Sequence, residues 1–147
     1  MLLLLHSFSH CWERVTQAVW RKYPNDLNPN VKTMDVLDRH VDEQGRLHTT
    51  RLVGSEGFLP SWVCNMIGVS NLGYAYEHSV IDPVKKTMIM QSRNVTLSGW
   101  VDVDETMTYS QHQDVDKWVC FDCFALKIGQ LFAANTLIQS KQSILPP

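Results

Sequence analysis

The cysteines are the first residues with the type and spacing for metal or redox chemistry. Cys120 and Cys123 form one CxxC motif inside DKWVCFDCFAL, a segment that predicts a β-strand. Positions i and i+3 of a strand point to opposite faces, so these thiolates do not easily share a zinc ion, and no second Cys/His pair lies at zinc spacing. The irregular spacing of the four cysteines favours reduced thiols. The sequence therefore predicts no metal site and no cofactor.

The histidines and the acidic residues are better explained as strand surfaces than as catalytic groups. His40 and His48 are predicted to face each other across the turn between two strands. Asp102, Asp104 and Glu105 are predicted to form the solvated face of a strand. The sequence contains no G-x-S-x-G, H-E-x-x-H, P-loop or G-x-G-x-x-G motif, so the protein is not expected to be an enzyme.

Lys22 is a basic residue whose position suggests a binding role. It lies at the edge of the apolar stripe of a predicted helix rather than in the middle of the polar face. The residues alone leave two interpretations open. Lys22 is either a helix-end lysine that interacts with the helix dipole and extends into water, or a cation directed at an anionic ligand.

The helix that positions Lys22 is predicted over about residues 10–22, with Ser9 as its N-cap. Its apolar stripe follows i, i+3, i+4 spacing and consists of Trp12, Val15, Val19 and Tyr23. Pro24 ends the helix, because the residue before a proline avoids helical geometry.

Beyond Pro24 the hydrophobic period changes from 3.6 to 2, which predicts a series of strands. They are expected at 31–41, 46–54, 74–81, 87–95, 99–109 and 117–128, with polar loops at 42–45 and 110–116. The N-terminal segment MLLLLHSFSH is interpreted as a short strand or an exposed terminus rather than a secretory signal. Residues 58–68 fit a short helix or a loop, and residues 129–140 have helical character.

This order of elements predicts the α+β class. We expect a curved antiparallel sheet of about six to seven strands, with an N-terminal helix and a C-terminal helix. A single domain is expected over residues 1–140, followed by a tail at 141–147.

The bulk composition limits the partners of the protein. Apolar residues make up 44% and charged residues 19% of the 147 residues, as in an ordinary globular domain. The formal net charge of −2 gives no whole-molecule attraction to nucleic acid or to anionic membranes, so any anion site must be local. No apolar run approaches the ~20 residues that a membrane span needs.

Several long segments together resemble the PRELI-like family and look closest to its slowmo branch. They are RKYPN…NPNV, VLDRHVDEQGRLHTTRLVGSE, LPSWV, EHSVIDPVKKTM and SRNVTL. The resemblance covers about residues 12 to 110 and weakens after that. It implies a curved antiparallel sheet around a lipid pocket, covered by a long C-terminal helix and gated by an apolar loop.

The resemblance also implies a function. Family members carry one anionic phospholipid, phosphatidic acid or phosphatidylserine, between mitochondrial membranes across the intermembrane space. They contact the membrane surface transiently and work with a small helical partner protein of the twin-CX9C type. No nucleic acid partner is expected.

The resemblance assigns roles to three basic residues. A buried phosphate needs a cation, and the family places one directly before the YPN sequence, where this chain has Lys22. Arg51 in TTRL matches a second basic position, and Arg93 in SRNV is a third candidate for the lipid headgroup. The alternative for each arginine is a solvated position on a strand. A lysine at the first position supplies a point charge without bidentate geometry, so headgroup selectivity is expected to differ.

The segment LPSWVCNMIG matches the gating loop of the family. The predicted lid or membrane-contacting residues are Leu59, Pro60, Trp62, Val63, Met66 and Ile67, since aromatic and aliphatic side chains on a mobile loop suit the membrane interface. The alternative is a helix of the core.

The chain also departs from the family pattern. Ser55 and Phe58 lie near positions where some members have lysines, and the acidic Glu56 lies between them. The long C-terminal helix is expected to be cut short near Ser140. The alternative function is therefore a transfer-defective interaction protein that retains only the partner-binding surface.

Overall fold

The computed structural model describes residues 2–57, 60–68, 70–96, 98, 102–112 and 119–128. Its elements are β1 (Leu2–Phe8), α1 (Trp12–Trp20), β2 (Val31–Val41), β3 (Leu47–Glu56), α2 (Ser61–Ile67), β4 (Leu72–Asp82), β5 (Thr87–Asn94), β6 (Asp102–Gln111) and β7 (Val119–Ile128). The predicted C-terminal helix at 129–140 and the tail at 141–147 lie outside the described residues.

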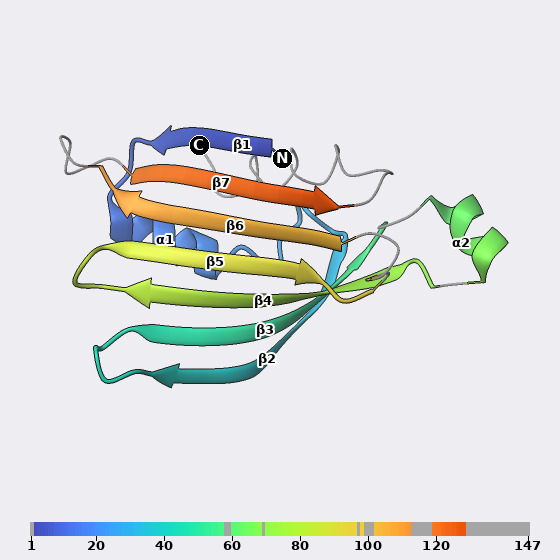
Figure 1. Ribbon diagram of the computed structural model, residues 1–147, viewed down its shortest axis with the longest axis horizontal. Helices are drawn as coiled ribbons and strands as arrows, with labels where there is room; N and C mark the ends of the chain where they lie inside the picture. Colours follow the sequence, from blue (N-terminus) through green and yellow to red (C-terminus); the bar gives the residue numbers. More distant parts are fainter. Residues whose placement is uncertain are drawn as a thin grey trace.

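The seven strands form one antiparallel sheet in the order β1-β7-β6-β5-β4-β3-β2 (Figure 1). Strands β2 to β7 follow one another as a meander, and β1 pairs with β7. The predicted α+β class with an antiparallel sheet and an N-terminal helix is therefore confirmed. The N-terminal leucine segment is a strand, the first of the two interpretations that the sequence allowed.

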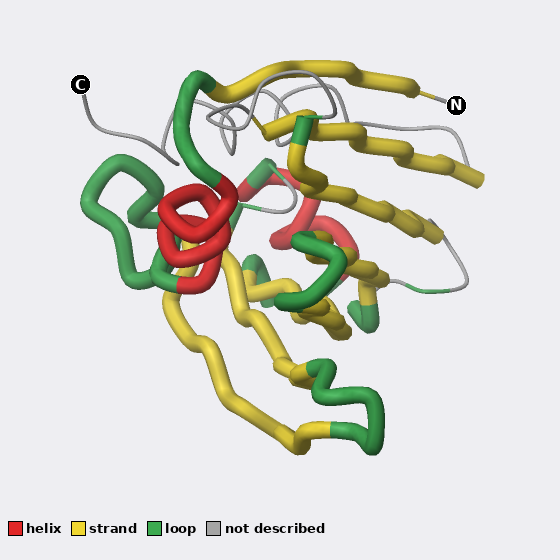
Figure 2. Tube along the Cα trace, turned by 90° about the vertical axis from the view of Figure 1, so that its left-hand side faces the viewer, coloured by secondary structure: helices red, strands yellow, loops and turns green. Residues whose placement is uncertain are grey.

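Helix α1 packs against one face of the sheet, and we call this face the inner face and the other the outer face. The sheet bends around α1 (Figure 2). The core between them contains Trp12, Val15 and Val19 of α1 and the sheet residues Met88, Met90, Tyr109, Val119 and Phe121. The predicted apolar stripe thus becomes the buried face of the helix, except that Tyr23 lies beyond the end of α1.

The start of α1 differs from the prediction. The N-cap is Cys11 rather than Ser9, and its side chain makes no capping hydrogen bond. The Cys11 carbonyl oxygen accepts the N–H groups of Arg14 and Val15, each at 3.1 Å. Strand β1 extends to Phe8, so the chain must bend at residues 9–10 before a helix can begin. The sequence signal for Ser9 was wrong because it took no account of this strand.

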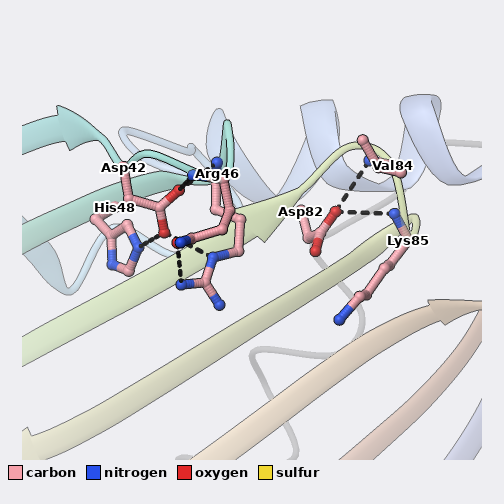
Figure 3. A network of polar contacts seen from close by, with 7 residues as sticks. Asp42, Arg46, His48, Asp82, Val84 and Lys85 are labelled. Atoms are coloured by element: carbon pink, nitrogen blue, oxygen red, sulfur yellow. Dashed lines mark hydrogen bonds and ion pairs between the residues drawn. The ribbon is translucent and has the colours of Figure 1, made fainter.

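The turns of two hairpins are held by aspartates (Figure 3). Asp42 accepts the backbone N–H groups of Gln44 at 3.0 Å and Arg46 at 2.9 Å, and Gly45 takes a positive φ of 76° that completes this turn. Asp82 accepts the N–H groups of Val84 and Lys85 in the β4–β5 turn. These turns fix the registers of the strands that they join.

The β2–β3 register confirms the predicted cross-strand histidine pair. His40 lies directly opposite His48, and the two rings stack with centroids 5.1 Å apart. Several other strands end at different residues from those predicted. Strands β3 and β4 continue to pair as far as Glu56 opposite Leu72, and β6 runs to Gln111, so the predicted loop at 110–116 begins too early.

Candidate headgroup site

Lys22 lies two residues beyond the end of α1, and its side chain is turned toward the sheet. Only 11% of that side chain is exposed, and its Nζ atom lies 3.7 Å from Glu77 Oε2. The Nζ atom also lies 5.2 Å from the centroid of the Tyr23 ring. This placement differs from that of a helix-end lysine extended into water.

Arg51 of β3 reaches the same carboxylate from the sheet. Arg51 and Glu77 are directly opposite each other on β3 and β4, and Arg51 Nη2 donates a hydrogen bond to Glu77 Oε1. Their side chains are 3% and 6% exposed. Glu77 is in turn opposite Ser92, two residues beyond the buried Met90, so the pair lies on the inner face. Lys22, Arg51 and Glu77 form what we call the buried charge cluster.

The donors of Arg51 are incompletely used within the described part of the chain. One guanidinium nitrogen bonds to Glu77, and Nη1 lies 3.5 Å from the weakly accepting sulfur of Met34. The buried Nε atom has no hydrogen-bond partner. Because buried polar groups are normally satisfied, this unpartnered donor is a candidate for a hydrogen bond to a further acceptor such as an oxyanion.

Trp20, the last residue of α1, is in contact with two guanidinium groups. The central guanidinium carbon is 4.8 Å from the Trp20 ring for Arg39 and 5.4 Å for Arg51. Cation–π contacts of this kind hold a guanidinium plane without consuming its N–H donors. Trp20 therefore helps to position Arg51 while leaving Nε available.

Arg93 is not brought together with the buried charge cluster. It is one residue beyond Ser92 on β5, so it points to the outer face. Its side chain is 64% exposed, and its Nε atom lies 3.1 Å from Asp104 Oδ1 on β6. The structure therefore places Arg93 in the solvated strand position that was the alternative for this residue.

The predicted lid is a short helix that projects beyond the ends of β3 and β4 (Figure 1). Pro60 is the N-cap of α2, and Gly68 ends the helix with a φ of 69°. Trp62 is 65% exposed and Met66 is 71% exposed, on the same side at i, i+4 spacing. Val63 is half-buried, whereas Leu59 and the Ile67 side chain lie outside the described part. The exposure of Trp62 and Met66 differs from that expected of a core helix.

A family model for the PRELI-like family matches residues 13–139 of the 147. The chain belongs to the PRELI-like family. The resemblance seen in its segments is thereby confirmed over most of the chain.

Two relatives are similar to this PRELI-like chain over most of its length. It is 40% identical over 110 residues to protein UPS2, mitochondrial, of Saccharomyces cerevisiae, covering 74% of this chain and 48% of that protein. It is 31% identical over 128 residues to the protein slowmo homolog of Dictyostelium discoideum, covering 86% of this chain and 56% of that protein. The chain thus spans about half the length of these curated relatives.

A solved structure is also similar. The Zhui aromatase/cyclase from a Streptomyces species superposes with a TM-score of 0.47 at 10% identity, covering 87% of this chain and 69% of that one. In the described ranges, no helix has the length and apolar composition of a membrane span. Within the same ranges, no three His, Cys, Asp or Glu side chains gather as a metal ion would require.

The lipid pocket expected for a PRELI-like protein stays a prediction. A depression of about 370 Å³ lies over β4, β5 and β6. It is lined by Tyr76, His78, Gln91, Ser92, Arg93, Asp104, Glu105 and Thr106, most of them outer-face residues, and by no member of the buried charge cluster. Its lining includes the charged residues Arg93, Asp104 and Glu105, so we do not identify it with an acyl-chain pocket.

Sequence reasoning missed Glu77 and Trp20. Glu77 carried a usable signal, since it is the single acidic residue in phase with the small Ala75 and Ser79 on β4. Its pairing with Arg51 was not readable, because α2 separates β3 from β4 and no tight turn sets their register. Trp20 lies next to the predicted apolar stripe and was read only as part of the helix.

Proposed function

We propose that this protein binds one anionic phospholipid, phosphatidic acid or phosphatidylserine, and transfers it between mitochondrial membranes. One observation carries the proposal. Two nearly buried cations, Lys22 and Arg51, converge from different elements on one carboxylate, which leaves the cluster with a net positive charge. Burying an excess cation is costly, so such an arrangement favours a ligand that supplies the missing negative charge.

In this proposal the phosphate of the headgroup binds between Lys22 and Arg51. Arg51 Nε, the orphaned donor, supplies one hydrogen bond, and the Lys22 ammonium supplies another. The headgroup site lies on the inner face, so the acyl chains would occupy an apolar pocket on that face. Arg93 has no part in it, because its side chain points to the outer face.

Helix α2 is proposed as the lid and as the point of contact with the membrane surface. Trp62 and Met66 present an aromatic and a flexible apolar side chain to solvent, and both kinds of side chain partition well into the membrane interface. Pro60 and Gly68 bound the helix and would act as its hinges. Leu59, Val63 and Ile67 are proposed as further lid residues on the basis of the family resemblance.

The partner and the location are proposed from family membership. A small twin-CX9C helical protein is the expected partner, and the intermembrane space is the expected location. The yeast relative UPS2 is described as mitochondrial, which supports the organelle but not the compartment. Neither catalysis nor a cofactor is part of the proposed function, since transfer requires only binding and release.

The test is transfer of fluorescent phosphatidic acid and phosphatidylserine between liposomes, with and without the twin-CX9C partner. Lys22→Glu reverses a charge inside the cluster and is expected to reduce transfer at least about tenfold, since the phosphate would then face two carboxylates. Lys85→Glu makes the same change at an exposed position in the β4–β5 turn and is the matched control. Circular dichroism and thermal unfolding would establish that both variants fold.

The outcomes separate the two candidate functions. Transfer by the wild type that is lost in Lys22→Glu and kept in Lys85→Glu supports a phospholipid carrier with its headgroup at Lys22. Equal transfer by the wild type and both variants would show that Lys22 does not bind the headgroup. A folded wild type that binds the partner but moves no lipid would favour the transfer-defective interaction protein.

A further inference from the structure

Glu77 is a buried carboxylate in a site that is proposed to bind a phosphate, and such a site would bind more tightly without it. Glu77 is 5% exposed, and within the described residues both cations of the buried charge cluster are paired with it. A carboxylate and a phosphate oxygen offer cations the same kind of acceptor. While no phosphate is bound, the Glu77 carboxylate therefore supplies the negative charge that pairs with Lys22 and Arg51.

We propose that Glu77 is an internal counter-anion that competes with the headgroup phosphate and makes its release possible. This inference rests on the proposed function and adds a step to it, the unloading of the lipid. When the phosphate enters, it shares the two cations with Glu77. When it leaves, Glu77 restores their pairing, so neither cation is left buried without a partner.

The two ion pairs of Glu77 differ in a way that suits this exchange. The bond between Arg51 and Glu77 joins direct cross-strand neighbours and is fixed by the register of β3 and β4. The Lys22 Nζ to Glu77 Oε2 distance of 3.7 Å is longer than a hydrogen bond, and Lys22 comes from the segment after α1. Lys22 is thus the cation that can turn to a phosphate at little cost, while Arg51 stays in place.

The charge balance gives the direction of the effect. The empty cluster has a net charge of +1, and a singly charged phosphate, such as the diester of phosphatidylserine or the monoanion of phosphatidic acid, brings it to zero. With a neutral residue in place of Glu77, the empty cluster would carry +2 and would remain positive after binding. The variant without the Glu77 charge should therefore attract the phosphate more strongly than the wild type, because charges interact strongly in a poorly solvated site. Differences in affinity usually appear in the dissociation rate, so this variant should release the lipid more slowly.

The experiment separates uptake from delivery. Wild-type protein and Glu77→Gln are incubated with phosphatidic acid liposomes, isolated, and mixed with neutral phosphatidylcholine acceptor liposomes. Lipid bound after isolation measures uptake, and the half-time of its appearance in the acceptors measures release. Glu77→Gln is expected to hold at least as much lipid and to release it about tenfold more slowly, the factor that roughly 1.4 kcal/mol of added affinity gives.

Two further variants keep the test decisive. Glu13→Gln makes the same change at the exposed Glu13 on α1, which is paired with Lys86 at 3.3 Å, and it should release lipid like the wild type. Glu77→Asp keeps the charge but withdraws the carboxylate by one methylene, so its release should fall between those of the wild type and Glu77→Gln. It also decides the question if Glu77→Gln does not fold.

The inference is overturned if folded Glu77→Gln releases lipid as fast as the wild type, or if it loses uptake because Glu77 is needed only to hold Lys22 and Arg51 in place. If Glu77→Gln does not fold, Glu77→Asp with wild-type release overturns it as well. Wild-type transfer in these cases leaves the proposed function intact. A folded wild type that takes up no anionic lipid would instead refute the proposed function, and the role of Glu77 with it.

Discussion

At the residue scale, one step along β5 separates a position on the inner face from an exposed position on the outer face. Ser92 is opposite Glu77 and shares the inner face with the buried charge cluster, whereas Arg93 follows it and points outward. The three basic residues that the family resemblance singled out therefore divide into an inner pair and an outer arginine. Successive side chains of a strand point to opposite faces, so the position of each residue along its strand decides this division rather than its type.

Replacing Arg93 with glutamine is consequently expected to change lipid transfer less than about twofold, since an exposed ion pair contributes little to stability or binding. Arg51→Gln should instead reduce transfer at least about tenfold, because it removes a buried charge that faces Glu77. The liposome assay compares both variants with the wild type. Equal losses in the two variants would place the headgroup elsewhere.

At the element scale, the β2–β3 hairpin is closed by one carboxylate. Asp42 Oδ2 lies 2.6 Å from Arg46 Nε and 3.0 Å from His48 Nε2, in addition to the two backbone N–H groups on Oδ1 (Figure 3). Partial burial by itself raises the pKa of Asp42, but the hydrogen bonds from Arg46 and His48 outweigh it and hold this pKa well below its ordinary value. The charged form thus stabilises the hairpin.

The sign of the resulting pH dependence follows from linkage. The carboxylate of Asp42 contributes stability that is fully present above its unfolded pKa of about 3.9 and is lost as the pH falls toward its lower folded value. Asp42→Asn should therefore lower the Tm at pH 7, and its difference from the wild type should shrink below about pH 4. Thermal unfolding followed by circular dichroism at pH 7, 4 and 3 measures this.

The control for this prediction is Asp82→Asn in the β4–β5 turn. The amide oxygen of asparagine can still accept the N–H groups of Val84 and Lys85, so a smaller loss of Tm is expected at pH 7. A constant Tm difference between wild type and Asp42→Asn at all three pH values would contradict the assignment.

Helix α2 is the element whose proposed role depends on exposure. Trp62→Ser should weaken association with neutral liposomes about tenfold, since burying a large apolar side chain is worth about 1.5–3 kcal/mol. Val84→Ser is the matched control, because Val84 is 86% exposed in the turn at the opposite end of β4. Sedimentation with liposomes measures both, and equal losses would show that α2 is not the contact.

At the scale of the whole molecule, the net charge does not attract the protein to anionic membranes. The net charge is −2 at pH 7 and the isoelectric point is about 6.3, so anionic membranes repel the protein weakly at neutral pH. In the proposed function, recognition of an anionic headgroup would therefore come from the buried charge cluster, where two cations face one carboxylate.

Lowering the pH from 7.4 to 5.5 should reverse the sign of the net charge and increase association with phosphatidylserine-containing liposomes. Association with neutral phosphatidylcholine liposomes should change little, and about 0.5 M salt should remove the increase, because it screens charges beyond a few ångströms. Sedimentation at both pH values provides the test. The same increase on both kinds of liposome would point to exposure of apolar surface instead.

The sequence by itself determined α1, the strands β2 to β7 and the resemblance to the family, and it left β1 and α2 open. Apolar spacing of 3.6 residues gave the buried stripe of α1, and alternation gave the six strands from β2 to β7, because these periodicities are local properties of the chain. The segments around YPN and TTRL pointed to Lys22 and Arg51 through the family resemblance. Periodicity does not indicate that Lys22 and Arg51 are both paired with Glu77.

Only the tertiary structure decided what surrounds Lys22 and Arg51. Glu77 reaches Arg51 through the register of β3 and β4, which are joined by a segment that contains α2 rather than by a tight turn. Lys22 reaches Glu77 because α1 packs across the inner face of the sheet. Such contacts join residues far apart in the chain, and their energy depends on burial, which a local pattern does not specify.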